Sequence, residues 1–156
     1  MIRKDFHIQY LEYSWEEFGS MPEKALFELA RKAAGQAYAP YSGFHVGAAV
    51  QLDNGRLYSA GNQENKAYPS GTCAERALLF FVQANHPNQV IRKMVLVAGH
   101  GPVLTNEPVY PCGACRQVLV EAEERQKQPI ELWMTGNNRI HKVDSCSDLL
   151  PLKFIL

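Results

Sequence analysis

Two short stretches of the sequence carry three of its four cysteines, and they constrain the fold more than any other feature. The first covers residues 72–76 (Thr-Cys-Ala-Glu-Arg) and the second residues 111–117 (Pro-Cys-Gly-Ala-Cys-Arg-Gln). Each follows a short lead-in that contains Gly or Pro and opens a helix-forming run, so we expect both at helix N-termini. Free N–H groups and a partial positive charge at such a position stabilise a thiolate. A fold that packs the two helix starts side by side brings Cys73, Cys112 and Cys115 around one ion.

The ligand count indicates a catalytic metal site. Three protein ligands with one open position are typical of a catalytic zinc, whereas a structural zinc has four protein ligands. Glu75 follows Cys73 by two residues and can act on whatever fills the open position. Cys146 has no second cysteine near it and is not expected to bind the metal. A structural zinc, or a redox pair formed by Cys112 and Cys115, stays open as an alternative. The histidines show no metal-ligand spacing: His7, His45, His86, His100 and His141.

Composition fits one soluble enzyme domain over residues 1–156. The chain is 46% hydrophobic and 21% charged, and its 16 basic and 16 acidic residues give a net charge of zero. Basic residues are scattered among acidic ones, which disfavours a nucleic-acid partner. Neither a signal peptide nor a membrane-length apolar run is visible, so we expect no membrane partner. We expect cytoplasmic localisation, where thiols stay reduced and able to bind a metal.

Hydrophobic periodicity and turn signals predict an α/β fold. A helix starts at Pro22, and a loop covers residues 38–43. Further helices are expected over 74–85 and 113–126. Strands are expected over 46–52, 56–61, 90–98, 130–135 and 139–143, the first two joined by an Asn-Gly turn. This order predicts a three-layer α/β/α sandwich with a mixed five-stranded sheet. Residues 1–21 form an N-terminal extension that the pattern leaves unclassified.

The residue pattern resembles the zinc-dependent cytidine deaminases, in particular the small type with three cysteine ligands. Cys-x-Glu followed by Pro-Cys-x-x-Cys is the zinc nucleobase deaminase signature. The resemblance extends from about Pro22 to Phe154, and further matching segments are 41–49, 61–65, 68–71 and 149–154. Gln63 departs from the family, which usually has Val or Ile there. The loop before Pro111 also looks longer than usual, which bears on the rim of the pocket.

The resemblance implies a role for each matching residue. Cys73, Cys112 and Cys115 would bind one Zn²⁺ per chain, and Glu75 would be the catalytic proton shuttle. Arg76 would offset the negative charge of the thiolates, with Arg116 as a weaker candidate for the same work. Asn62 and Glu64 would bind the ribose. The remaining substrate-binding residues would be Phe44, Tyr68, Ala74 and Phe154. The family also implies a homotetramer in which the C-terminal aromatic residue enters a neighbour's site.

The expected activity is hydrolytic deamination of cytidine and deoxycytidine to uridine and deoxyuridine, with release of ammonia, in pyrimidine salvage. One alternative is another zinc aminohydrolase on the same scaffold, such as a blasticidin-type deaminase. A nucleic-acid-editing deaminase is disfavoured by the zero net charge. A non-catalytic zinc-stabilised domain is disfavoured because such a domain has no use for Glu75.

Overall fold

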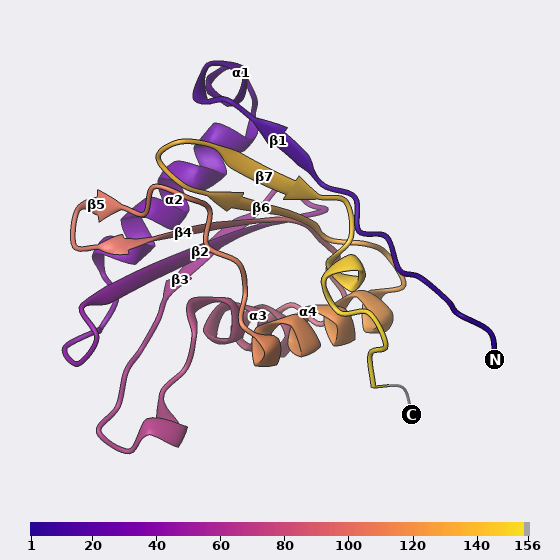
Figure 1. Ribbon diagram of the computed structural model, residues 1–156. Helices are drawn as coiled ribbons and strands as arrows, with labels where there is room; N and C mark the ends of the chain where they lie inside the picture. The colour runs from indigo at the N-terminus through magenta and orange to yellow at the C-terminus, as the bar shows by residue number, and fades with distance from the viewer. Residues whose placement is uncertain (155–156) are drawn as a thin grey trace.

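One seven-stranded sheet organises the computed structural model, which describes residues 1–154 (Figure 1). The strand order is β1-β7-β6-β4-β2-β3, and β5 pairs with β4 beside this path. The strands are β1 (Leu11–Tyr13), β2 (Phe44–Leu52), β3 (Leu57–Gly61), β4 (Ile91–His100), β5 (Val103–Leu104), β6 (Glu131–Thr135) and β7 (Ile140–Val143). The β4–β6 pair is parallel, and the other pairs are antiparallel.

Helices cover both faces of the sheet, which confirms the predicted three-layer α/β/α architecture (Figure 1). The helices are α1 (Trp15–Gly19), α2 (Glu23–Gly35), α3 (Ala74–Asn85) and α4 (Gly113–Gln126), with 3₁₀ turns η1 (Tyr68–Ser70) and η2 (Cys146–Leu149). The α1 and α2 helices pack on one face, while α3 and α4 lie beside each other on the opposite face. None of the helices within residues 1–154 is long and apolar enough to cross a membrane.

The predicted five-stranded sheet is short by two strands. All five predicted strands form, but β1 and β5 extend the sheet. These added strands have three and two residues. Alternation of apolar and polar residues cannot be recognised over so few positions, because the strand signal needs about four to eight residues. The three residues of β1 come from the N-terminal extension, which is therefore part of the sheet.

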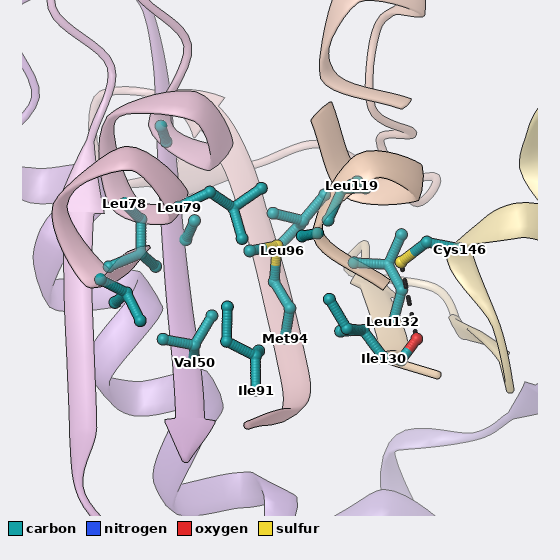
Figure 2. Close-up of a cluster of buried hydrophobic side chains, with 14 of the residues drawn as sticks. Val50, Leu78, Leu79, Ile91, Met94, Leu96, Leu119, Ile130, Leu132 and Cys146 are labelled. Atoms are coloured by element: carbon teal, nitrogen blue, oxygen red, sulfur yellow. Dashed lines mark hydrogen bonds between the residues drawn. The ribbon is translucent and has the colours of Figure 1, made fainter. Parts of the chain in front are cut away.

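The period-2 alternation of the strands divides the core between the two faces. Ala48, Val50 and Leu52 of β2 point toward α3 and α4, whereas Ala49 points toward α2. Figure 2 shows the larger cluster, in which Cys146 lies among aliphatic side chains and donates its thiol hydrogen to the Ile130 carbonyl oxygen at 3.5 Å. Cys146 is fully buried there, so it serves as a core residue.

The sheet and α2 approach each other so closely that β2 needs a glycine. A Cβ atom on Gly47 would lie 1.9 Å from the Ala30 carbonyl oxygen of α2. No side chain fits at that distance, so the small residues of both elements set the spacing. This contact fixes the start of β2, where Phe44 and Val46 lie, relative to the rest of the scaffold.

Candidate active site

Three cysteine sulfurs meet where the N-termini of α3 and α4 lie together. Cys73 is the N-cap residue of α3, Cys112 is the N-cap residue of α4, and Cys115 lies in the first turn of α4. The Cys112 Sγ atom lies 4.0 Å from the Cys73 Sγ and 3.5 Å from the Cys115 Sγ. All three sulfurs lie within 4.8 Å of one another, and none forms a disulfide.

The donor set fits a zinc ion. Neither Cys73 nor Cys112 uses its side chain to cap its helix, so both sulfurs are free to bind a metal. A hydrogen bond from Cys115, helped by Arg76 and Cys112, lowers the pKa of Cys73 to about 5. The bond with Cys73, together with burial, raises the pKa of Cys115. A zinc ion would take the place of these contacts between sulfurs, because thiolate sulfur is a preferred zinc ligand.

Glu75 lies beside the sulfurs in the first turn of α3. Its side chain lines the pocket, and the residue is only 5% exposed. Burial raises the pKa of the Glu75 carboxyl. A carboxyl group in such a place exchanges a proton more readily near neutral pH than an exposed one does.

The two candidate arginines have different surroundings. The Arg76 Nη2 atom lies 4.0 Å from the Cys73 Sγ, and the buried Arg76 Nε has no hydrogen-bond partner within residues 1–154. Arg116 instead donates from Nε to the Pro111 carbonyl oxygen at 2.9 Å and from Nη1 to the Leu149 carbonyl oxygen at 3.0 Å. Arg116 therefore ties the start of α4 to η2, and of these two arginines it is Arg76 that contacts a cysteine sulfur.

A cavity of about 660 Å³ opens in front of the sulfurs and Glu75. Its walls include most of the residues that the sequence predicts for substrate binding: Phe44, Asn62, Glu64 and Tyr68. Ala74, the first residue of α3, is fully buried and does not line the cavity. Phe154 is 68% exposed and does not line the cavity of its own chain.

The predicted ribose-binding residues are already hydrogen-bonded to backbone groups. The Asn62 Oδ1 accepts from the Val46 N–H at 2.8 Å, and its Nδ2 donates to the Phe44 carbonyl oxygen at 3.0 Å. The Glu64 carboxylate accepts from the Tyr41 N–H at 2.8 Å and from the Ser42 hydroxyl. These bonds lower the pKa of Glu64, so it is an anion at neutral pH. These hydrogen bonds hold both side chains in fixed orientations at the cavity wall.

The cavity also has walls that the motifs did not indicate. Leu96 and Ala98 contribute from β4, and Val109 and Tyr110 from the loop that precedes α4. The β4 positions read as ordinary strand core in the sequence. Tyr110 lies in the loop whose unusual length was visible, but length alone does not reveal which side chain turns inward.

Known proteins share the sequence pattern on which this site is built. Residues 21–128 match the family described as the cytidine and deoxycytidylate deaminase zinc-binding region. The chain belongs to the cytidine deaminase family. This membership confirms the resemblance and the enzyme class predicted from the sequence, and the Cys73, Cys112 and Cys115 cluster lies within the matched zinc-binding region.

Similar proteins include both sequence relatives and solved structures of this family. Cytidine deaminase of Sporosarcina psychrophila is 43% identical over 101 residues, which are 65% of this chain and 70% of the relative. A crystal structure of cytidine deaminase from Burkholderia pseudomallei has a TM-score of 0.72 and 36% identity, covering 86% of this chain and 100% of that one. Cytidine deaminase from Mycobacterium tuberculosis has a TM-score of 0.67 and 32% identity, over 88% and 100% of the two chains.

Proposed function

We propose that this member of the family removes the 4-amino group of cytidine and deoxycytidine by hydrolysis. The nucleoside and one water become uridine or deoxyuridine and one ammonia. The observation that carries the proposal is the placement of a buried carboxyl, Glu75, beside a cluster of three thiols at a cavity large enough for a nucleoside. The proposed role of the reaction is pyrimidine salvage.

Cys73, Cys112 and Cys115 would hold one zinc ion per chain. When bound, zinc lowers the pKa of a coordinated water from ~15.7 toward ~7. The positive ends of α3 and α4 and the Arg76 guanidinium offset the charge of three thiolates. That offset keeps the sulfurs ionised and available as ligands.

Glu75 is the proton shuttle of the proposed reaction. Its carboxylate takes a proton from the attacking water and gives a proton to N3 of the pyrimidine ring. The carboxylate then takes the second proton from the hydroxyl group that has been added to ring carbon C4 and gives it to the departing amine. C4 becomes a carbonyl as ammonia leaves, and the carboxylate is regenerated. Burial suits Glu75 to this exchange because it raises the pKa of the carboxyl toward the working pH.

Asn62 and Glu64 are proposed to bind the ribose hydroxyls with the lone pairs and N–H that their backbone contacts leave free. Phe44 and Tyr68 line the same cavity and give it apolar walls for the nucleoside. Ala74 would contribute through its main chain, since its side chain is fully buried. Binding energy from the sugar helps to position the base for reaction.

We also propose a cytoplasmic homotetramer of single-domain chains. Phe154 lies outside the cavity of its own chain and exposes two thirds of its surface. An exposed aromatic residue of this kind is available to a neighbouring subunit. Ile155 and Leu156, the end of the same apolar tail, lie outside the described residues.

A substrate panel tests the activity. Purified, zinc-loaded protein is incubated with cytidine, deoxycytidine, free cytosine, adenosine and blasticidin S, and ultraviolet absorbance is followed. Turnover of both cytosine nucleosides, with cytosine far slower, supports the proposal and the role of the sugar. Turnover of blasticidin S alone would assign the alternative aminohydrolase, and no turnover of any compound would contradict an enzyme function.

A further inference from the structure

The loop that leads from β5 to α4 is fastened to the turn between β6 and β7. The Asn137 N–H donates to the Thr105 carbonyl oxygen at 2.7 Å. Gly136 permits this contact because a Cβ atom there would lie 2.4 Å from the Glu107 carbonyl carbon. The loop therefore has a fixed path before it reaches the cavity wall at Val109 and Tyr110.

Tyr110 is then held by a chain of buried and half-buried polar groups. Its hydroxyl lies 2.7 Å from the Nδ1 atom of His141, a residue of β7 that is only 6% exposed. The other ring nitrogen, Nε2, lies 2.8 Å from the Glu12 Oε2. An ionised carboxylate only accepts hydrogen bonds, so Nε2 carries a proton, and in the neutral imidazole Nδ1 then accepts from the Tyr110 hydroxyl.

The N-terminal segment supplies the last group of this chain. Glu12 and His141 are directly opposite each other in the β1–β7 pairing. Arg139 donates from Nη1 to the Glu12 Oε2 at 3.3 Å and forms a second ion pair with Glu107 of the loop. The Tyr10 ring packs on the His141 ring at a centroid distance of 4.7 Å. Residues 10–12 therefore close over the imidazole and fix its orientation.

This arrangement links the N-terminal segment to the wall of the cavity. Tyr110 lies two residues before Cys112, and both line the cavity. The Tyr110 hydroxyl is engaged in the hydrogen bond with His141. A molecule bound in the cavity would therefore contact the aromatic ring of Tyr110 and not its hydroxyl group. Without the His141 contact, a tyrosine with 48% of its surface exposed has other rotamers available in solvent.

We propose that Tyr110 is a substrate-binding residue of the pocket wall and that His141 and Glu12 are positioning residues that hold it. This inference rests on the proposed function only in taking a pyrimidine nucleoside as the ligand. It also gives β1, which precedes the residues that match the family, a role in substrate binding, because Glu12 of β1 holds the His141 side chain that contacts Tyr110. Loss of Glu12 then weakens substrate binding although Glu12 itself does not line the cavity.

The test compares three variants of the zinc-loaded protein: Tyr110→Phe, Glu12→Gln and the double variant. Binding of uridine is measured by titration calorimetry, and KM and kcat are measured with cytidine. Each single variant should weaken uridine binding and raise KM by about 3- to 10-fold, with kcat changed by less than about twofold. The double variant should bind uridine no more weakly than the single variant with the larger loss, because both changes break the same chain of contacts.

Glu16→Gln is the matched control, since Glu16 is an exposed glutamate of α1 in the same segment. It should bind uridine like the wild type. Unchanged uridine binding in Glu12→Gln, or additive losses in the double variant, would overturn the positioning role. A wild type that neither binds nor deaminates any pyrimidine nucleoside would instead overturn the proposed function.

Nitrogen-15 NMR of the histidines gives a readout that needs no substrate. The wild type should show His141 with the proton on Nε2, and Tyr110→Phe should shift the Nδ1 resonance because its hydrogen-bond donor is gone. A His141 signal that Tyr110→Phe leaves unmoved would contradict the chain of contacts even if the enzyme is active.

Discussion

The Arg76 Nη2 atom lies 4.0 Å from the Cys73 Sγ, one helical turn further along α3. The pair places a fixed positive charge next to a thiolate at the position where zinc binding would concentrate three negative charges. Because Glu75, the proposed proton shuttle, lies between them in the sequence, we expect a change in the pair to affect Glu75 as well.

Arg76→Gln should therefore lower activity and weaken zinc binding. Groups that orient and neutralise metal ligands are typically worth ~10- to 100-fold in affinity or activity. Zinc affinity by competition with a chelator, and kcat/KM for cytidine, are the measurements. Arg125→Gln on the outer part of α4 is the control, since Arg125 bonds only to Gln83 among the described residues. Equal behaviour of the two variants would contradict the role of Arg76.

Glu75→Gln should retain zinc and fold yet lose most turnover. The glutamine is nearly isosteric but cannot carry a proton between water, N3 and the amine. We expect kcat to fall by at least ~10³-fold, measured together with zinc content and thermal unfolding. The exposed Glu121→Gln on α4 provides a charge-matched control with wild-type kcat. Activity of Glu75→Gln within about tenfold of the wild type would mean that another group moves the protons.

The zinc-binding set should be separable from the fourth cysteine. Cys112→Ala should lose zinc, because it removes a sulfur 3.5 to 4.0 Å from both other ligands. Cys146→Ala should keep one zinc per chain, because its thiol is buried in the core against Ile130 (Figure 2). The measurement is the zinc content per chain of each folded variant. Full zinc in Cys112→Ala, or zinc loss in folded Cys146→Ala, would refute the assignment.

The sequence predicted the parts of the site that depend on local structure. Cys73 and Cys112 stand at helix starts because the lead-in and the helix-forming runs fix those starts, and α3 and α4 begin where the pattern indicates. The five longer strands were predicted for the same reason, since each has a recognisable pattern of apolar and polar residues within its own segment.

The contacts that the sequence did not predict join residues far apart in the chain. Glu12 and His141 are 129 positions apart and meet through a three-residue strand. The Asn62 amide was expected to face the ribose, but both of its polar atoms also bind the backbone of β2. A polar residue at a strand end looks the same in a sequence whichever partner it takes, so only the folded structure distinguishes them.

Glu123→Gln should destabilise the fold without touching the pocket. The buried Glu123 Oε1 accepts from the Ile130 and Cys146 N–H groups, both at 2.7 Å, and its Oε2 accepts from Ser145 and Ser147. A glutamine NH₂ only donates. In the place of Oε2 it leaves the Ser147 N–H without this acceptor, and in the place of Oε1 it faces the Ile130 and Cys146 N–H donors.

The expected loss in the free energy of unfolding is about 2–4 kcal/mol, measured by urea denaturation. The neighbouring Glu124→Gln is the control, because Glu124 forms a half-exposed ion pair with Lys153 worth less than ~1 kcal/mol. Similar losses in both variants would show that the Glu123 contacts contribute little.

Phe154 should act in a neighbouring subunit. The residue is 68% exposed and follows Leu152, which has a left-handed backbone conformation with a φ of 56° just after η2. Phe154→Ala should therefore lose activity although its own cavity is intact. Mixing Phe154→Ala chains with Glu75→Gln chains under subunit exchange should partly restore activity, because some sites then combine an intact Glu75 with a neighbour's Phe154.

A mixture of Glu75→Gln and Cys73→Ala chains is the matched control. Both changes lie at the cavity of one chain, so exchange cannot repair a site and activity should stay at the level of the separate variants. Analytical ultracentrifugation at the assay concentration establishes whether tetramers are present, because a shared site requires assembly. A wild-type monomer with full activity, or a Phe154→Ala protein as active as the wild type, would exclude a contribution of Phe154 to a neighbour's reaction.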